Sequence, residues 1–155
     1  MSRDADAPAR TSWLVPVQLV AVAAHALPGG PGLTVPVPAR VLGAATVAAG
    51  LALTWSSARR LGADLTPAVT PRPGAALRTD GVYARTRHPL YAGVLVASAG
   101  AVLLRGRLST LLAAAVLGGV LHVKAGAEDR VLAERFGPAW RAYAARVPRL
   151  VPRLR

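Results

Sequence analysis

The chain has 155 residues, 53% of them hydrophobic, and a formal net charge of +12. A soluble domain of this size rarely combines these values, so we expect one integral-membrane domain over residues 1–155, with a soluble Ala-rich bundle as the weaker alternative. The absence of cysteine excludes disulfides, thiolate metal sites and a cysteine nucleophile, and the arginines flank apolar runs, which favours a membrane surface over nucleic acid as partner.

The first half of the chain holds two apolar segments. One runs from about Trp13 to Leu27, which is short for a membrane span, and a Pro- and Gly-rich break follows at residues 28–32. The other runs from about Val41 to Ala58. Because backbone groups in lipid need internal hydrogen bonds, we expect both to be helices. A cleaved signal peptide is not expected, since no clear small-residue cleavage site follows the charged N-terminus.

A polar connector, Arg59–Arg87, follows, and its three prolines (Pro67, Pro71 and Pro73) argue against a long helix. Its end runs into the densest polar pattern of the chain, residues 81–93, where cationic and aromatic side chains lie against the start of an apolar run. Hydrocarbon excludes such groups unless they have a function or reach the interface. The pattern therefore predicts a polar site at a membrane face.

Two further apolar segments, Pro89–Leu104 and Leu108–Val123, are joined by three residues, which predicts an antiparallel helical hairpin. Glycines in both are expected to allow close contact within that hairpin: Gly93, Gly100, Gly118 and Gly119. The tail is expected to be helical from Glu128 to Arg135, to break near Gly137, and to form a second helix over Ala139–Arg146. The expected fold is all-α, with about four transmembrane helices and a C-terminal helical hairpin.

Four spans would place both termini and the connector on one side, which carries most of the arginines. The positive-inside rule then predicts that the connector and the tail are cytoplasmic and meet in space. The Ala-, Gly- and Arg-rich composition suggests a bacterium with a GC-rich genome, so we expect the inner membrane.

The ordered motifs resemble the isoprenylcysteine carboxyl methyltransferase family, part of a wider group of small membrane methyltransferases that includes phospholipid N-methyltransferases. The resemblance covers about residues 55–152. It rests on the segment 81–93, the Glu128-Asp129 pair, Phe136-Gly137, Trp140, Tyr143 and the Arg146-Val147-Pro148 segment.

The resemblance implies a cytosol-facing pocket for S-adenosylmethionine. It assigns cofactor contacts to Leu77, Arg78, Tyr83, His88, Pro89, Leu90, Tyr91 and Glu128. Lys124 stands where eukaryotic members have an arginine near the substrate carboxylate, and it is a candidate catalytic residue together with Arg87. The implied partners are membrane lipid and a lipophilic or lipidated acceptor, and no metal is expected.

Three departures leave the acceptor open between a carboxylate, a thiol and an amine. Ala75 stands where the family often has histidine, Asp129 replaces a glutamate, and Lys124 replaces an arginine and lacks its bidentate geometry. The chemistry of the residues is compatible with the cofactor: Glu128 suits a diol or an ammonium, and cationic side chains suit a carboxylate. Tyr83 or Tyr91 can stack on adenine or face a sulfonium.

Simpler interpretations remain for these residues. The arginines can anchor the interface, the tyrosines can belong to an aromatic belt, and Lys124 and Glu128, four residues apart, can form an intrahelical ion pair. His25 and His122 are expected to make local contacts outside the site. Two other functions also remain: an NADPH-dependent membrane reductase of the sterol-reductase group, and a non-enzymatic lipid-binding membrane protein.

Overall fold

The computed structural model describes residues 13–27 and 32–151, and the regular elements within these residues are all helices. The elements in chain order are α2 (Leu14–Ala24), α3 (Val37–Leu61), the 3-10 turns η1 (Gly62–Asp64) and η2 (Gly81–Ala84), α4 (Pro89–Arg105) and α5 (Leu108–Arg146). The expected all-α class is confirmed. The expectations for the N-terminal residues, for most of the break at 28–32 and for residues 152–155 lie outside the described residues.

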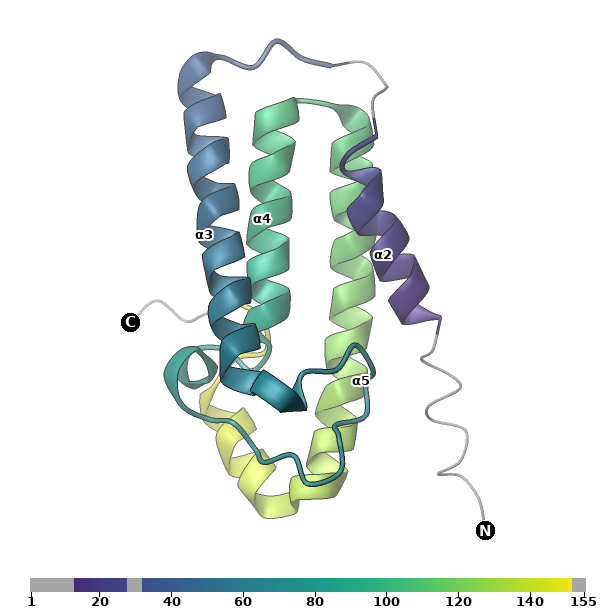
Figure 1. The fold of residues 1–155 in the computed structure, drawn as a ribbon, viewed down its shortest axis with the longest axis vertical. Coiled ribbons are helices and arrows are strands. Elements are labelled where there is room, and N and C mark those ends of the chain that lie inside the picture. Colours follow the sequence, from purple (N-terminus) through teal and green to yellow (C-terminus); the bar gives the residue numbers. More distant parts are fainter. Residues whose placement is uncertain (1–12, 28–31, 152–155) are drawn as a thin grey trace.

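Helices α3, α4 and α5 lie side by side, and the short α2 packs along α5 (Figure 1). Two helical stretches are long and apolar enough to cross a membrane: Val37–Asp64 and α5. Helix α4 has 17 residues and α2 has 11. Since about 20 residues are needed to cross a hydrocarbon core, the expected count of four spans is not established by helix length.

The helix of the fourth apolar segment continues into the polar tail, as the expected placement of Lys124 and Glu128 on one helix requires. Helix α5 continues past Val123 without interruption, because no helix-breaking residue separates the apolar run from the polar tail. The predicted break near Gly137 is confirmed, since this residue has φ 52° and ψ −122° and Pro138 follows it. Glycine reaches this positive φ without a Cβ clash, so the chain kinks here and the last turns of α5 change direction.

The glycines of α4 contact α3, not α5, so the expectation of a glycine contact within the α4–α5 hairpin was wrong. A Cβ built at Gly100 would lie 2.7 Å from the carbonyl oxygen of Gly43, and one at Gly93 would lie 2.7 Å from that of Gly50. On α5, by contrast, Gly119 has open space around it. We call Gly43, Gly50, Gly93 and Gly100 the glycine contact. Here the backbones of α3 and α4 lie closer together than larger side chains would allow.

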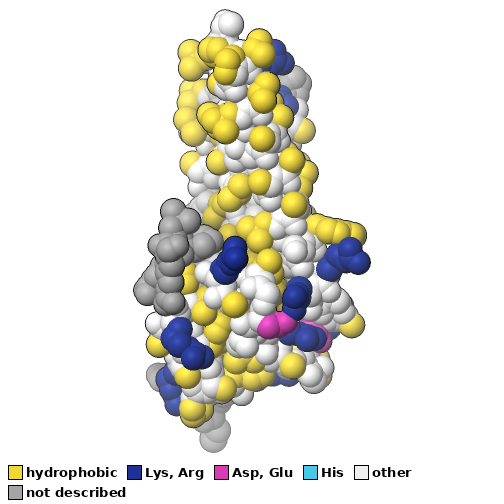
Figure 2. Space-filling model, turned by 90° about the vertical axis from the view of Figure 1, so that its left-hand side faces the viewer, with side chains coloured by type: hydrophobic (Ala, Val, Ile, Leu, Met, Phe, Trp, Pro, Cys, Tyr) yellow, Lys and Arg dark blue, Asp and Glu magenta, His cyan; other side chains and the backbone are white. Residues whose placement is uncertain are grey.

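Charged side chains gather toward one end of the molecule, as the face in Figure 2 shows. At that end the connector and the tail meet, as predicted: the backbone N–H of Arg87 donates to Pro148 (2.9 Å) and that of His88 to Arg149 (3.1 Å). Elsewhere α3 leaves Val41, Leu51 and Trp55 exposed. An apolar surface of this kind is suited to hydrocarbon.

Candidate functional site

A cavity of about 390 Å³ opens at the polar end of the helices, within the size range of small-molecule sites. Its walls come from α2, the end of α3, the connector, the start of α4 and the polar half of α5. Nine of the ten residues singled out from the sequence line it: Leu77, Arg78, Tyr83, Arg87, His88, Leu90, Tyr91, Lys124 and Glu128. The tenth, Pro89, is buried in the first turn of α4 and does not line the cavity.

His88 lies immediately before α4, because Pro89 occupies the first turn, where its missing N–H costs no hydrogen bond. The buried imidazole contacts two carboxylates: Nε2 lies 2.8 Å from Asp129 and Nδ1 lies 3.2 Å from Glu128. Burial lowers the pKa of His88, but the hydrogen bonds and charges of these carboxylates outweigh it, and the net effect raises the pKa. The imidazole therefore favours its protonated, doubly donating form.

Glu128 has both carboxylate oxygens engaged, one by His88 and the other by the hydroxyl of Tyr91, which donates to it. The Tyr91 ring also stacks on the His88 ring, with centroids 5.6 Å apart and planes 5° from parallel. These three residues come from α5, α4 and the turn before α4. They form one connected group in the wall of the cavity that α4 and α5 supply.

Lys124 makes no ion pair with Glu128 among the described contacts, so the intrahelical ion pair considered from the sequence is absent there. Its ammonium donates to the side-chain oxygen of Gln18 in α2 (3.0 Å) and lies 5.3 Å from the Tyr91 ring centroid. The residue is only 2% exposed. With a neutral partner and no carboxylate against it among the described contacts, Lys124 is free to meet an anionic ligand, whose charge would offset the cost of burying the ammonium.

Arg87 and Asp129 belong to a second ionic group, which joins the connector to the tail. Arg87 Nη1 lies 3.2 Å from Asp129, Arg149 Nε donates to the same carboxylate at 2.7 Å, and the Arg87 guanidinium lies 5.6 Å from the Trp140 ring centroid. Neighbouring residues of a helix point in different directions, so Glu128 faces the cavity while Asp129 faces the tail.

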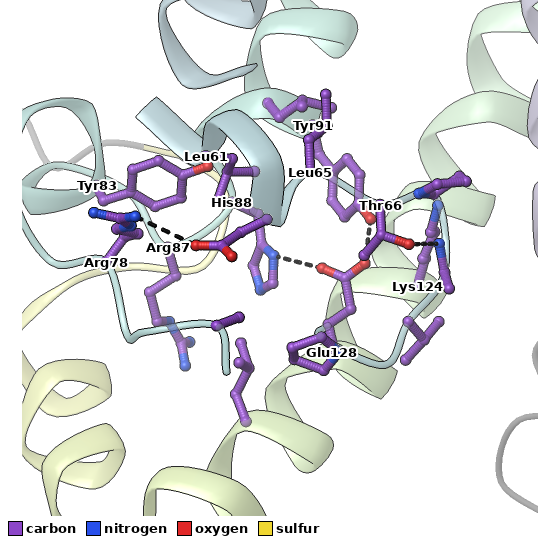
Figure 3. Close-up of a pocket in the computed structure, with 18 of the residues that line it drawn as sticks. Leu61, Leu65, Thr66, Arg78, Tyr83, Arg87, His88, Tyr91, Lys124 and Glu128 are labelled. Carbon is purple, nitrogen blue, oxygen red and sulfur yellow. Dashed lines mark hydrogen bonds and ion pairs between the residues drawn. The ribbon is translucent and has the colours of Figure 1, made fainter. Parts of the chain in front are cut away.

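The connector supplies the opposite wall. Arg78 Nη2 lies 3.3 Å from Asp64 Oδ2, and both side chains line the cavity. Tyr83 is buried in η2, burial raises its pKa, and its carbonyl oxygen accepts a hydrogen bond from the Tyr143 hydroxyl (2.6 Å). Figure 3 shows Arg78 and Tyr83 on one side of the cavity, Lys124, Glu128 and Tyr91 on the other, and His88 between them.

Several residues of this site were not singled out from the sequence. Gln18 and Asp64 line the cavity and belong to no motif. Trp140 and Tyr143 also line it; they were named in the resemblance but were given no role in the site. Gln18 had a detectable signal, since a lone polar residue in an apolar helix is a candidate functional residue. Arg149 had none, because its partner Asp129 lies 20 positions away in the chain. Asp129 was named in the resemblance but was given no partner there. His25 does make the expected local contact, with the Ala21 carbonyl oxygen at 2.8 Å, but its other ring nitrogen contacts Ser98 of α4, 73 positions away, so its contacts are not only local.

Comparisons with known proteins agree with the predicted resemblance. The family model described as phospholipid methyltransferase matches residues 38–139. The protein-S-isoprenylcysteine O-methyltransferase of Schizosaccharomyces pombe is 36% identical over 77 residues, or 49% of this chain. The aligned part is 33% of that relative's length.

Proposed function

The chain belongs to the phospholipid methyltransferase family, and on that premise we propose that it is a membrane methyltransferase that uses S-adenosylmethionine and methylates a lipophilic acceptor. The observation that carries the proposal is the single cavity shared by nine of the motif residues. They come from segments far apart in the chain, and their carboxylate, imidazole, guanidinium and aromatic groups suit a charged nucleoside.

The side chains that line the cavity match the chemical groups of this cofactor. Tyr91 and Tyr83 offer aromatic faces, which attract a sulfonium, and Leu77 and Leu90 offer apolar surface for an adenine. Glu128 can accept hydrogen bonds from a ribose diol once its present donors adjust. S-adenosylmethionine supplies a methyl group already activated on a sulfonium, so the protein needs no strong nucleophile of its own.

The chain's own residues then have to align the two reactants and exclude water. We assign the acceptor to the end of the cavity where Lys124 meets Gln18 and the apolar residues Val15 and Leu19 of α2. A buried ammonium favours a carboxylate or thiolate over a protonated amine, because like charges repel. A carboxylate, thiolate or tertiary amine acceptor needs no general base; a protonated amine would need one, and His88 and Glu128 are the candidates at the cavity.

The orientation in the membrane is also part of the proposal. The apolar helices would lie in the bilayer with the cavity at its cytoplasmic face, since the connector and the tail carry most of the arginines. For a bacterial source this is the inner membrane. A lipophilic acceptor would then enter sideways, past α2, without leaving the bilayer.

Binding of S-adenosylmethionine to the full chain in detergent or nanodiscs tests the site. We expect saturable binding that is lost in Glu128→Ala and in His88→Ala and is retained in His122→Ala, whose side chain is exposed and outside the cavity. Unchanged binding in both site variants would refute the assignment. The same assay with NADPH tests the reductase alternative, and transfer of a labelled methyl group into a total lipid extract identifies the acceptor class.

A further inference from the structure

Three carboxylates lie at or beside the cavity, and they differ in how fully they are engaged. Glu128 contacts Tyr91 and His88, and Asp129 contacts His88, Arg87 and Arg149 through hydrogen bonds and ion pairs. Asp64 has one partner among the described residues, Arg78, at 3.3 Å. Asp64 is therefore the carboxylate at this cavity with the most unused accepting capacity, since an ionised carboxylate has about four acceptor positions.

The Asp64–Arg78 pair is also loosely held. The side chains are 26% and 43% exposed, and a single contact joins them instead of the two that an arginine and a carboxylate can form. Exposed pairs of this kind contribute little to stability and are easily opened. Both side chains line the cavity, and Figure 3 shows the Arg78 guanidinium beside the Tyr83 ring, across His88 from Glu128.

An α-amino acid group carries an ammonium and a carboxylate a few bonds apart. A neighbouring carboxylate and guanidinium match it group for group, and its insertion replaces one ion pair by two with no change in net charge. At the α4–α5 wall of the cavity such an exchange would break the contacts among His88, Tyr91 and Glu128. The ammonium of a ligand is therefore accommodated at lower cost by Asp64 than by Glu128.

We propose that Asp64 and Arg78 together bind the amino-acid end of the cofactor, Asp64 taking its ammonium and Arg78 its carboxylate. The inference rests on the proposed function and deepens it by setting the direction of the cofactor in the cavity. The amino-acid end then lies against the connector and the acceptor lies at Lys124, across the cavity. Asp64 becomes a binding residue in a segment, η1, to which no motif pointed.

Two ligands that differ only at this end provide the test. S-adenosylhomocysteine carries the amino-acid group, whereas 5′-methylthioadenosine has a methyl in its place. With the full chain in nanodiscs, we expect Asp64→Asn to weaken S-adenosylhomocysteine binding about tenfold, as loss of a hydrogen bond to a charged group does, and to leave methylthioadenosine binding within about twofold. Asp64→Glu keeps the carboxylate and should restore most of the affinity.

The chain offers a matched control in Asp80, which pairs with Arg60 between the connector and the end of α3 but does not line the cavity. Asp80→Asn should change neither affinity. If Asp64→Asn weakens both ligands equally, or neither, or if methylthioadenosine binds the wild type as tightly as S-adenosylhomocysteine, the inference is overturned while the proposed function stands. If the wild type binds neither ligand, the proposed function itself fails.

Discussion

The glycine contact and the polar end of the molecule join distant parts of the chain by opposite means. Gly43 and Gly50 meet Gly100 and Gly93 through bare backbone, with no room for a Cβ. At the polar end Asp129 collects three cationic side chains around one carboxylate. In hydrocarbon, where there is no hydrophobic drive between helices, close packing has to hold them together, whereas the cavity needs charged groups that can exchange partners with a ligand.

The largest expected effect comes from breaking the polar end. Asp129→Ala leaves His88, Arg87 and Arg149 without their shared carboxylate, and loss of one member of a largely buried ionic group costs about 3 kcal/mol. We expect a clearly lower unfolding midpoint in detergent and loss of S-adenosylmethionine binding, because the tail detaches from the connector. Glu134→Ala, at an exposed position of α5, should change neither measurement; equal effects of the two substitutions would refute this role of Asp129.

A smaller effect is expected from the glycine contact. A Cβ at Gly50 would press on the backbone of α4, so Gly50→Ala should destabilise the chain by about 2 kcal/mol through overpacking. Gly119→Ala adds the same methyl group to α5 in open space and should be neutral or slightly stabilising. The comparison is made by thermal unfolding of both variants in the same detergent, and equal midpoints would contradict the close α3–α4 packing.

The smallest effect is the pH dependence contributed by His88. Its pKa is raised above the ordinary value of about 6.5 by Asp129 and Glu128. The protonated form is therefore the one that the fold stabilises. The contribution of His88 to the stability of the fold is complete below about pH 6.5 and is lost as the pH rises through the raised pKa.

Stability measured against pH should consequently decline above about pH 6.5 in the wild type, and His88→Gln should remove that part of the decline. The measurement is the unfolding midpoint at several pH values in one detergent. Parallel curves for the two proteins would show that His88 is not held in its charged form by the carboxylates.

Much of the local structure could be predicted from the residues alone. Long apolar runs with few breakers have to be helical wherever water is scarce, and Pro89 and Gly137 mark a helix start and a kink because of their own backbone geometry. The family resemblance implied which residues would share a site, and nine of the ten line one cavity. Their individual roles stay predictions.

The partners of these residues were decided by the tertiary structure. Gln18 meets Lys124 across 106 positions, and Asp129 meets Arg149 across a kinked helix end. The glycines of α4 pack against α3 instead of α5. Helical propensity and polarity act over a few residues of chain, so they determine what each segment becomes. Which faces of the segments meet depends on the packing of all the helices at once, and that packing completes the cavity.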